Sequence, residues 1–309
     1  MALPAIADVH RARPATRMTI AARPSIAPLF RLVPHVADVV DVDTGLSSSF
    51  DAALLLPNSF RSALLVRRAR IPERWGYATD GRGFLLTRAV QRAPRGVHQV
   101  DYYRQLVHDL GFPNGATEPQ LVAPPALRST GADALARAGW DRRAAIVALA
   151  PGAAYGGAKR WPPEFFAAVA RGLADDGVAT VIVGSAADAD TAGEVARAFQ
   201  VCAAGATPPL TLVGRTDLPT LAGVLATCRA LVTNDSGAMH LAAALGVPVT
   251  AIFGPTDEHA TGPRGHVHHS VLTHDVWCRP CRLRECPLDH ACMLGVGADA
   301  VLRDARRAL

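Results

Sequence analysis

The sequence predicts an α/β protein with two βα-rich halves, each built on a parallel sheet that helices cover on both faces. Short apolar segments of buried-strand type alternate with helically spaced segments through most of the chain, and this alternation is typical of parallel sheets. The 309 residues, 50% of them hydrophobic, suffice for one large domain or two of ordinary size. Because parallel sheets bind ligands at the carboxyl ends of their strands, we expect functional residues in the turns that follow the strands.

The first half, residues 1–125, begins with an apolar-periodic segment that predicts a helix at 2–13. Apolar runs predict three strands after it, at 17–22, 38–42 and 52–56. Residues 126–143 are the predicted linker. Prolines and glycines punctuate the chain before it, and a helix at 132–138 leads into the second half.

The second half, residues 144–309, contains five predicted strands separated by helical stretches. They lie at 146–150, 178–183, 210–213, 230–233 and 249–253. The longest apolar stretch, 241–255, is interrupted by Gly246 and Pro248, and it is shorter than a membrane span. The first residues lack the charged and then apolar pattern of a signal peptide.

Charge is distributed unevenly along the chain. Residues 1–144 carry 19 arginines and 12 acidic residues, whereas residues 145–309 carry 13 basic and 15 acidic residues. The basic half is therefore the expected contact for an anionic partner or a membrane surface. Nucleic acid is not expected, because the arginines are scattered and aromatic residues are few. Six cysteines in a chain of this length do not resemble a secreted disulfide framework and indicate a reducing cytoplasm.

The single lysine, Lys159, stands among 31 arginines and lies in a glycine-rich turn between the strand at 146–150 and a helix at 163–173. Lys159 and Arg160 adjoin the helix N-terminus, where positive charge opposes the helix dipole unless an anion binds. The turn therefore predicts a phosphate site, with a stray surface lysine as the alternative. A Walker P-loop is disfavoured, because Arg160 occupies the position of the hydroxyl residue.

A second turn of the same kind follows the strand at 230–233. Asp235 or Ser236 can cap the next helix, and Gly237 lets a ligand approach the backbone N–H groups. His240 falls one turn into that helix. We expect Asp235 to accept sugar hydroxyls and the turn to share a diphosphate with Lys159; an ordinary Asx-type cap is the alternative.

Several motifs resemble those of the ADP-heptose:lipopolysaccharide heptosyltransferases of glycosyltransferase family 9, most of all its heptosyltransferase II group. The motifs are Pro57-Asn58-Ser59-Phe60-Arg61, the turn from Pro151-Gly152 to Trp161-Pro162, and Thr233-Asn234-Asp235-Ser236-Gly237 with His240. Further matches at 71–77 and 98–103 occur in the same order along the chain. The ordered set is more specific than any single motif.

This resemblance implies a GT-B architecture, in which two Rossmann-like domains with parallel sheets face a central cleft. It implies an inverting transfer without a metal or other cofactor, from ADP-heptose to a phosphorylated, Kdo-containing lipid A acceptor of the lipopolysaccharide inner core. The enzyme would then be cytoplasmic and peripheral at the inner membrane. The implied donor-binding residues are Lys159, Asp235, Ser236, Gly237, His240 and Gly152. Asn58, Ser59 and Arg61 suit the acceptor, with a polar strand cap as the alternative.

The chain departs from the family pattern at its first residues, Met1-Ala2-Leu3-Pro4. Family members carry a first strand and a Gly-Asp loop before this Leu-Pro pair, and that Asp is the general base of the proposed mechanism. We therefore expect about twenty further residues, one strand and a loop, upstream of Met1. Without them the chain would be an inactive sugar-nucleotide-binding protein. A nucleotide-sugar 2-epimerase is the other alternative, since it shares the two-domain architecture.

Four cysteines cluster near the end of the chain, at Cys278, Cys281, Cys286 and Cys292. They supply enough ligands for a structural zinc site, although their spacing does not match paired CxxC knuckles. Ordinary packing or reduced thiols near the surface are the alternatives. Cys202 and Cys228 are expected in the core.

Overall fold

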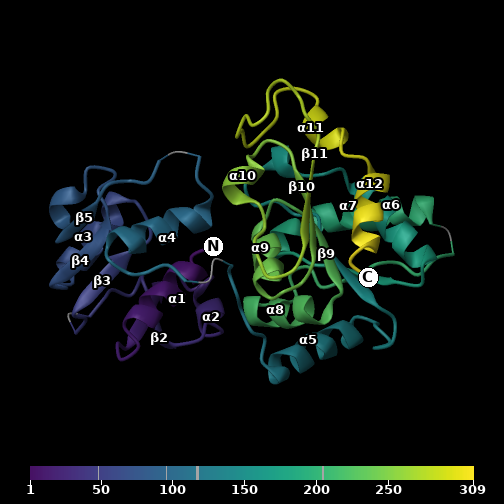
Figure 1. Cartoon of the computed structure of the whole chain (residues 1–309). Helices are drawn as coiled ribbons and strands as arrows, with labels where there is room; N and C mark the ends of the chain where they lie inside the picture. Colours follow the sequence, from purple (N-terminus) through teal and green to yellow (C-terminus); the bar gives the residue numbers. More distant parts are fainter. Residues whose placement is uncertain (48, 95, 116–117, 204) are drawn as a thin grey trace. The chain divides into compact units, whose positions relative to one another are not determined.

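The computed structural model describes residues 1–47, 49–94, 96–115, 118–203 and 205–309. It divides the chain into two compact units, Met1–Pro119 and Gln120–Leu309, both of α/β type (Figure 1). Helix α5, Pro125–Arg137, belongs to the second unit and packs on α8. The larger part of the predicted linker is therefore a helix, because tertiary packing outweighs the low helix propensity of its Gly131.

The second unit is built on a six-stranded parallel sheet. Its strands are β6 (Ile146–Ala150), β7 (Ala179–Ile182), β8 (Leu210–Thr211), β9 (Ala230–Asn234), β10 (Val249–Phe253) and β11 (His269–Thr273). Their order across the sheet is β11-β10-β9-β6-β7-β8. The order reverses between β6 and β9, which makes their carboxyl ends the topological switch point where ligands of such sheets bind.

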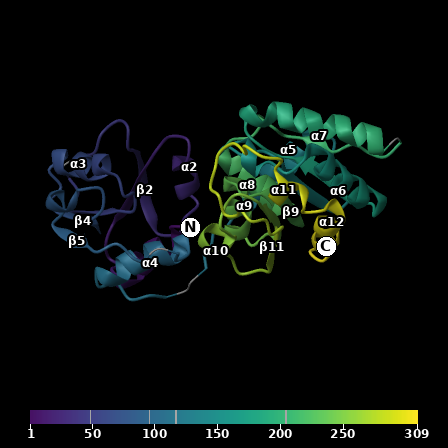
Figure 2. The same cartoon turned by 90° about the horizontal axis from the view of Figure 1, so that it is seen from above.

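Helices cover both faces of this sheet. The helices of this unit are α5, α6 (Pro163–Asp175), α7 (Ala189–Cys202), α8 (Leu218–Thr227), α9 (Gly237–Ala244), α10 (Glu258–Thr261), α11 (Ala291–Leu294) and α12 (Ala298–Arg306). Helices α6 and α12 lie on the opposite side of β9 from α9 (Figure 2). Val147 and Leu149 of β6 alternate toward α6, where they share a buried cluster with Phe166 and Val301. A strand buried on both faces explains the unbroken apolar run of β6.

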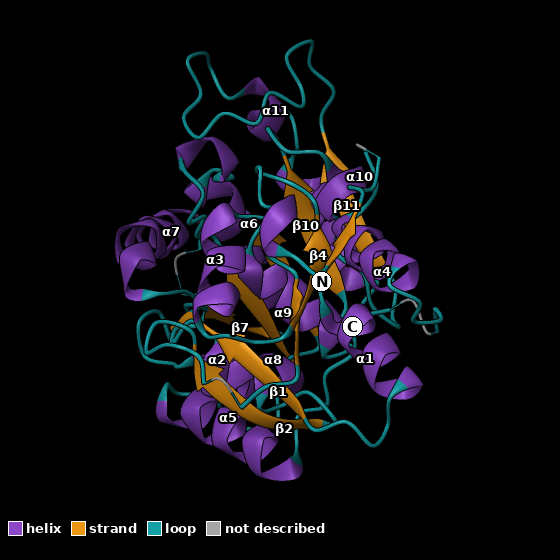
Figure 3. Cartoon of the chain, turned by 90° about the vertical axis from the view of Figure 1, so that its left-hand side faces the viewer, coloured by secondary structure: helices purple, strands orange, loops and turns teal. Residues whose placement is uncertain are grey.

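The first unit contains two parallel sheets. Strands β1 (Met18–Ala22) and β2 (Val36–Asp41) form one, and β3 (Ala52–Leu55), β4 (Glu73–Tyr77) and β5 (Arg88–Val90) form the other (Figure 3). Helices α1 (Leu3–Ala12), α2 (Ala27–Phe30), α3 (Phe60–Arg68) and α4 (Gln99–Asp109) complete the unit. Within the described residues β1 pairs only with β2, and β3 only with β4. Among the described strands, β1 and β3 are therefore each paired along one edge only.

Candidate functional site

The turn that carries Lys159 connects β6 to α6 and is held by a buried amide at the end of β9. Asn234 Oδ1 accepts a hydrogen bond from Trp161 N at 3.1 Å, and Asn234 Nδ2 donates to Pro151 O at 2.7 Å. Trp161 is fully buried, and its Nε1 donates to Val296 O at 2.8 Å. Helix α6 begins at Pro163, as predicted, and a proline suits the first helical position because it needs no N–H partner there. The two ends of the turn are therefore fixed to the neighbouring strand before any ligand binds.

Lys159 forms an ion pair with Asp235 across the switch point. The Nζ to Oδ2 distance is 2.5 Å, and the side chains are 11% and 7% exposed. Thr256 Oγ1 donates to the same Oδ2 at 2.8 Å. The structure thus brings together the two turns that the sequence assigned to one ligand. The prediction that the positive charge of Lys159 lacks a partner within the protein is wrong, because Asp235 forms an ion pair with it.

The amino end of α9 presents backbone N–H groups that its N-cap side chain does not bind. Ser236 is the N-cap residue and has extended backbone, but its side chain makes no cap hydrogen bond. Its Oγ lies 3.1 Å from Thr233 Oγ1 instead. A Cβ added at Gly237 would meet nothing within 4 Å, so packing does not require glycine there. The open amides leave this end of the helix available to an anion.

Two other predicted donor residues have different surroundings. His240 is half-buried in the first turns of α9. Gly152 follows β6, and a Cβ there would lie 2.1 Å from Asp188 Oδ1. That carboxylate accepts hydrogen bonds from Ser185 N and Oγ, both at 2.8 Å. The close approach of Asp188 is a sufficient reason for glycine at position 152, and its role toward a donor stays a prediction.

The predicted acceptor residues lie in the first unit, in the loop after β3 and the first turn of α3. Ser59 is the N-cap of α3 and accepts from Ser62 N at 3.3 Å, so its side chain caps a helix and not a strand. Asn58 Nδ2 donates to Tyr102 OH at 2.8 Å. Arg61 is exposed in the first turn of α3. Asn58 and Ser59 each hold the loop in place through a side-chain hydrogen bond. The Arg61 side chain is exposed and, among the described residues, forms no such bond.

A buried arginine that the sequence did not single out lies beneath this loop. Arg82 is fully buried, and its guanidinium donates to Tyr77 O at 2.9 Å, Ser59 O at 3.2 Å and Ser62 Oγ at 3.0 Å. Burial lowers the pKa of this guanidinium. Arg82 therefore anchors the loop that carries the predicted acceptor residues.

The four clustered cysteines line a single cavity of about 450 Å³, together with Ala158 of the Lys159 turn. Burial raises the pKa of Cys292, and the neighbouring Cys thiols raise it further. Among the described residues, no group of three or more His, Cys, Asp or Glu side chains is arranged to hold a metal ion. The zinc expectation is not supported. Cys228 is buried as predicted, but Cys202 is exposed, so its predicted place in the core is wrong.

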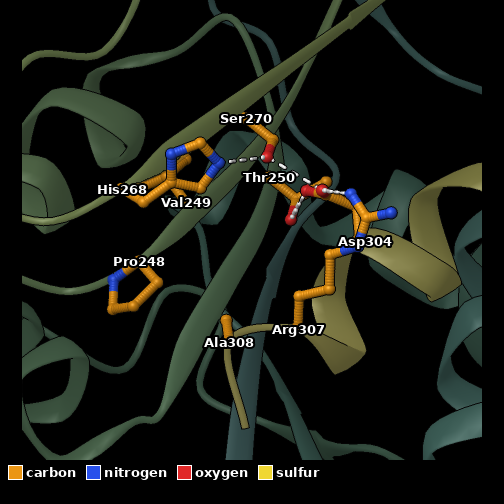
Figure 4. A pocket seen from close by; sticks show the side chains of 8 residues that line it. All are labelled: Pro248, Val249, Thr250, His268, Ser270, Asp304, Arg307 and Ala308. Carbon is orange, nitrogen blue, oxygen red and sulfur yellow. Dashed lines mark hydrogen bonds and ion pairs between the residues drawn. The ribbon is translucent and has the colours of Figure 1, made fainter.

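A smaller cavity of about 110 Å³ lies at the amino ends of β10 and β11. Asp304 of α12 accepts hydrogen bonds there from Thr250 Oγ1 and Ser270 Oγ, both at 2.8 Å (Figure 4). These bonds attach α12 to the sheet. Because ligands of parallel sheets bind at the carboxyl ends of the strands, we assign this cavity a structural role. Within the described part of the chain, no helix has both the length and the apolar character needed to cross a bilayer.

The fold and the switch-point cluster define a two-unit parallel α/β protein whose second unit carries a paired Lys159 and Asp235 at the topological switch point. Residues 46–292 match the sequence model of glycosyltransferase family 9 (heptosyltransferase). The chain belongs to this family.

Curated relatives and solved structures agree with this assignment. Lipopolysaccharide heptosyltransferase 2 of Salmonella typhimurium is 36% identical over 227 residues, which cover 70% of this chain and 63% of the relative. Lipooligosaccharide heptosyltransferase 2 of Haemophilus influenzae is 30% identical over 267 residues, 76% of this chain and 74% of the relative. The alignment thus spans less than two thirds of the Salmonella protein.

The structure of Escherichia coli ADP-heptose lipopolysaccharide heptosyltransferase II superposes with a TM-score of 0.81 at 27% identity, covering 99% of this chain and 93% of that one. A family 9 glycosyltransferase of Veillonella parvula gives the same TM-score at 20% identity, with 99% and 92% coverage. The predicted α/β fold of GT-B type, with two Rossmann-like units, is confirmed.

Proposed function

We propose that this protein transfers heptose from ADP-heptose to the inner core of lipopolysaccharide. The single observation that carries the proposal is the pairing of Lys159 and Asp235 at the switch point, beside the uncapped amino end of α9. A cation and helix amides stabilise the negative charge that grows on the departing diphosphate, and they do so without a metal ion. Membership of family 9 and the relatives named heptosyltransferase 2 support the choice of sugar.

The donor half of the proposed reaction uses residues of the second unit. Lys159 and the Gly237 amide bind the diphosphate, with Ser236 beside them, and Asp235 accepts hydroxyls of the sugar. Asp235 suits this task because one of its oxygens, Oδ2, already receives Lys159 and Thr256. Its second oxygen can then accept a sugar hydroxyl. His240 and Gly152 complete the proposed donor set.

The acceptor half uses the first unit. Arg61 is an exposed cation at the amino end of α3, suited to a phosphate of a Kdo-containing lipid A, and Asn58 and Ser59 shape the loop beside it. The excess of arginine in residues 1–144 supports binding of this anionic lipid at the cytoplasmic face of the inner membrane. We propose no residue of the described chain as the general base.

The decisive experiment incubates the purified full-length gene product with ADP-heptose and heptosylated Kdo-lipid A, and follows ADP release and the mass of the lipid. We expect ADP release only when the acceptor is present, with a gain of one heptose on the lipid. Conversion of the nucleotide sugar without acceptor would indicate an epimerase instead. Binding of ADP-heptose without turnover would indicate a non-catalytic binding protein, and either result would refute the proposed transfer.

A further inference from the structure

The cysteine-rich segment, residues 278–292, is bonded directly to the Lys159 turn. Ala158 N donates to Arg284 O at 2.9 Å, and Tyr155 OH donates to Arg282 O at 2.7 Å. Gly157 N donates to Glu285 Oε1 at 3.0 Å. Three residues of the turn are thus held by three residues of the segment.

Glycine in the turn is a consequence of this contact. A Cβ added at Gly156 would lie 2.3 Å from Arg284 O, and one added at Gly157 would lie 2.6 Å from a Glu285 carboxylate oxygen. The first of these obstacles is backbone and cannot rotate away. The backbones of the turn and the segment are therefore in contact. Any residue other than glycine at position 156 would prevent this contact.

The same segment is also tied to the loop after β10. Arg279 Nε donates to Gly254 O and Arg282 N donates to Pro255 O, both at 2.8 Å. The next residue of that loop is Thr256, whose hydroxyl binds Asp235. The segment thus bridges the Lys159 turn and the loop after β10, and each of these carries a side chain that binds Asp235.

Arg284 brings a second cation to the turn. Its Cζ lies 5.5 Å from the centre of the Tyr155 ring, and Lys159 Nζ lies 4.6 Å from the same centre. Arg284 is exposed, and within the described residues it has no carboxylate partner. Lys159, in contrast, is compensated by Asp235. Near this turn, Arg284 and the exposed Arg160 are therefore the cations whose charge is available to an anion, and Arg284 is the one supplied by the cysteine-rich segment.

We propose that the cysteine-rich segment is a clasp that completes the nucleotide site, and that Arg284 is a second cation for the diphosphate of the donor. This rests on the proposed function, since it assumes that a nucleoside diphosphate binds at the turn. A diphosphate carries more negative charge than the compensated Lys159 can balance. A guanidinium adds donors in a planar fork suited to phosphate oxygens.

The test is calorimetric titration of the full-length protein with ADP and with adenosine, for the wild type, Arg284→Ala and Arg284→Lys. We expect Arg284→Ala to weaken ADP binding about tenfold, in line with loss of one charge-assisted contact, and to leave adenosine binding unchanged. ADP binding by this variant should also depend less on salt than in the wild type. Arg284→Lys keeps the charge and should recover part of the affinity.

Arg303→Ala is the matched control, because Arg303 is an exposed arginine of α12. The control separates a local contact from a change in net charge. Equal ADP affinity of wild type and Arg284→Ala would overturn the role of Arg284 while leaving the proposed function intact. An equal loss in Arg303→Ala would also overturn it. A wild type that binds neither ADP nor adenosine would overturn the proposed function and this inference together.

Discussion

Replacement of Lys159 by alanine tests the switch-point pair most directly. The change leaves the Asp235 carboxylate, 7% exposed, with the Thr256 hydroxyl as its remaining side-chain partner among the described residues. Removing one member of a buried ion pair costs about 3 to 5 kcal/mol. Because both side chains retain slight exposure, we expect the lower figure, a loss of about 3 kcal/mol in the free energy of unfolding.

The effect on activity should be larger in kcat than in KM. Loss of one preorganised group that stabilises developing charge lowers kcat by about 10² to 10³. Lys159→Arg keeps the charge, but a planar guanidinium replaces a compact ammonium in a site that is 11% exposed. We therefore expect the arginine variant to recover only part of the rate. ADP release under saturating acceptor gives kcat and KM separately, and urea denaturation gives the stability.

The double variant Lys159→Ala with Asp235→Asn is the control for charge burial. It removes both charges, so stability should recover relative to Lys159→Ala, whereas activity should not. A kcat within threefold of wild type in Lys159→Ala, or full activity in Lys159→Arg, would refute the reasoning and return Lys159 to an ordinary structural lysine.

Three further predictions concern the second unit. Gly223→Ala should lower the free energy of unfolding by about 1 to 3 kcal/mol in urea, because the new Cβ would lie 2.1 Å from Leu127 O at the α5–α8 contact; an unchanged midpoint would contradict this. Burial raises the pKa of Cys228 to about 12, so a thiol reagent should label exposed Cys202 in the native protein and spare Cys228; rapid native labelling of both would argue against it. Burial, aided by His268, lowers the pKa of His269 to about 4. As the pH falls from about 6.5 to about 4, this histidine is therefore protonated in the unfolded chain but not in the folded protein. The free energy of unfolding should drop across that range. His269→Phe should flatten the pH profile of the melting temperature.

The strands that sequence predicts best are those buried on both faces. The predicted strands at 146–150 and 249–253 coincide with β6 and β10, because a strand between two helical layers is continuously apolar. Strands β4, β5 and β11 were not predicted. Strand β4 begins with Glu73-Arg74, and β5 and β11 are edge strands with polar residues. Their positions follow from pairing with a neighbour, which a local apolar pattern does not record.

In the candidate site, too, some features could be predicted from the sequence and others could not. The two strand-to-helix turns of the candidate site were predictable, since each combines a strand end, a glycine and a helix start within a short stretch. The groups that hold them were not, because Asn234 lies 73 residues from Trp161 and Arg284 lies far beyond both turns in sequence. Arg82 was missed for a different reason. In a chain with 31 arginines, nothing in the sequence distinguishes a fully buried guanidinium from a solvated one.

The compensation of Lys159 changes what the site needs in order to bind an anion. Excess positive charge at the turn would attract a phosphate by itself, but the ion pair with Asp235 cancels most of that attraction. Ground-state affinity for the proposed diphosphate must then come chiefly from the uncapped amides of α9 and from the exposed cations beside the turn, Arg284 and Arg160. Lys159 contributes most when charge accumulates on the departing diphosphate and competes with Asp235 for the ammonium. Such an interaction strengthens toward the transition state, which is the condition for raising kcat and not only binding. The lysine and the clasp arginine are therefore separable by experiment: substitution of Lys159 should act mainly on kcat, and substitution of Arg284 mainly on ADP affinity.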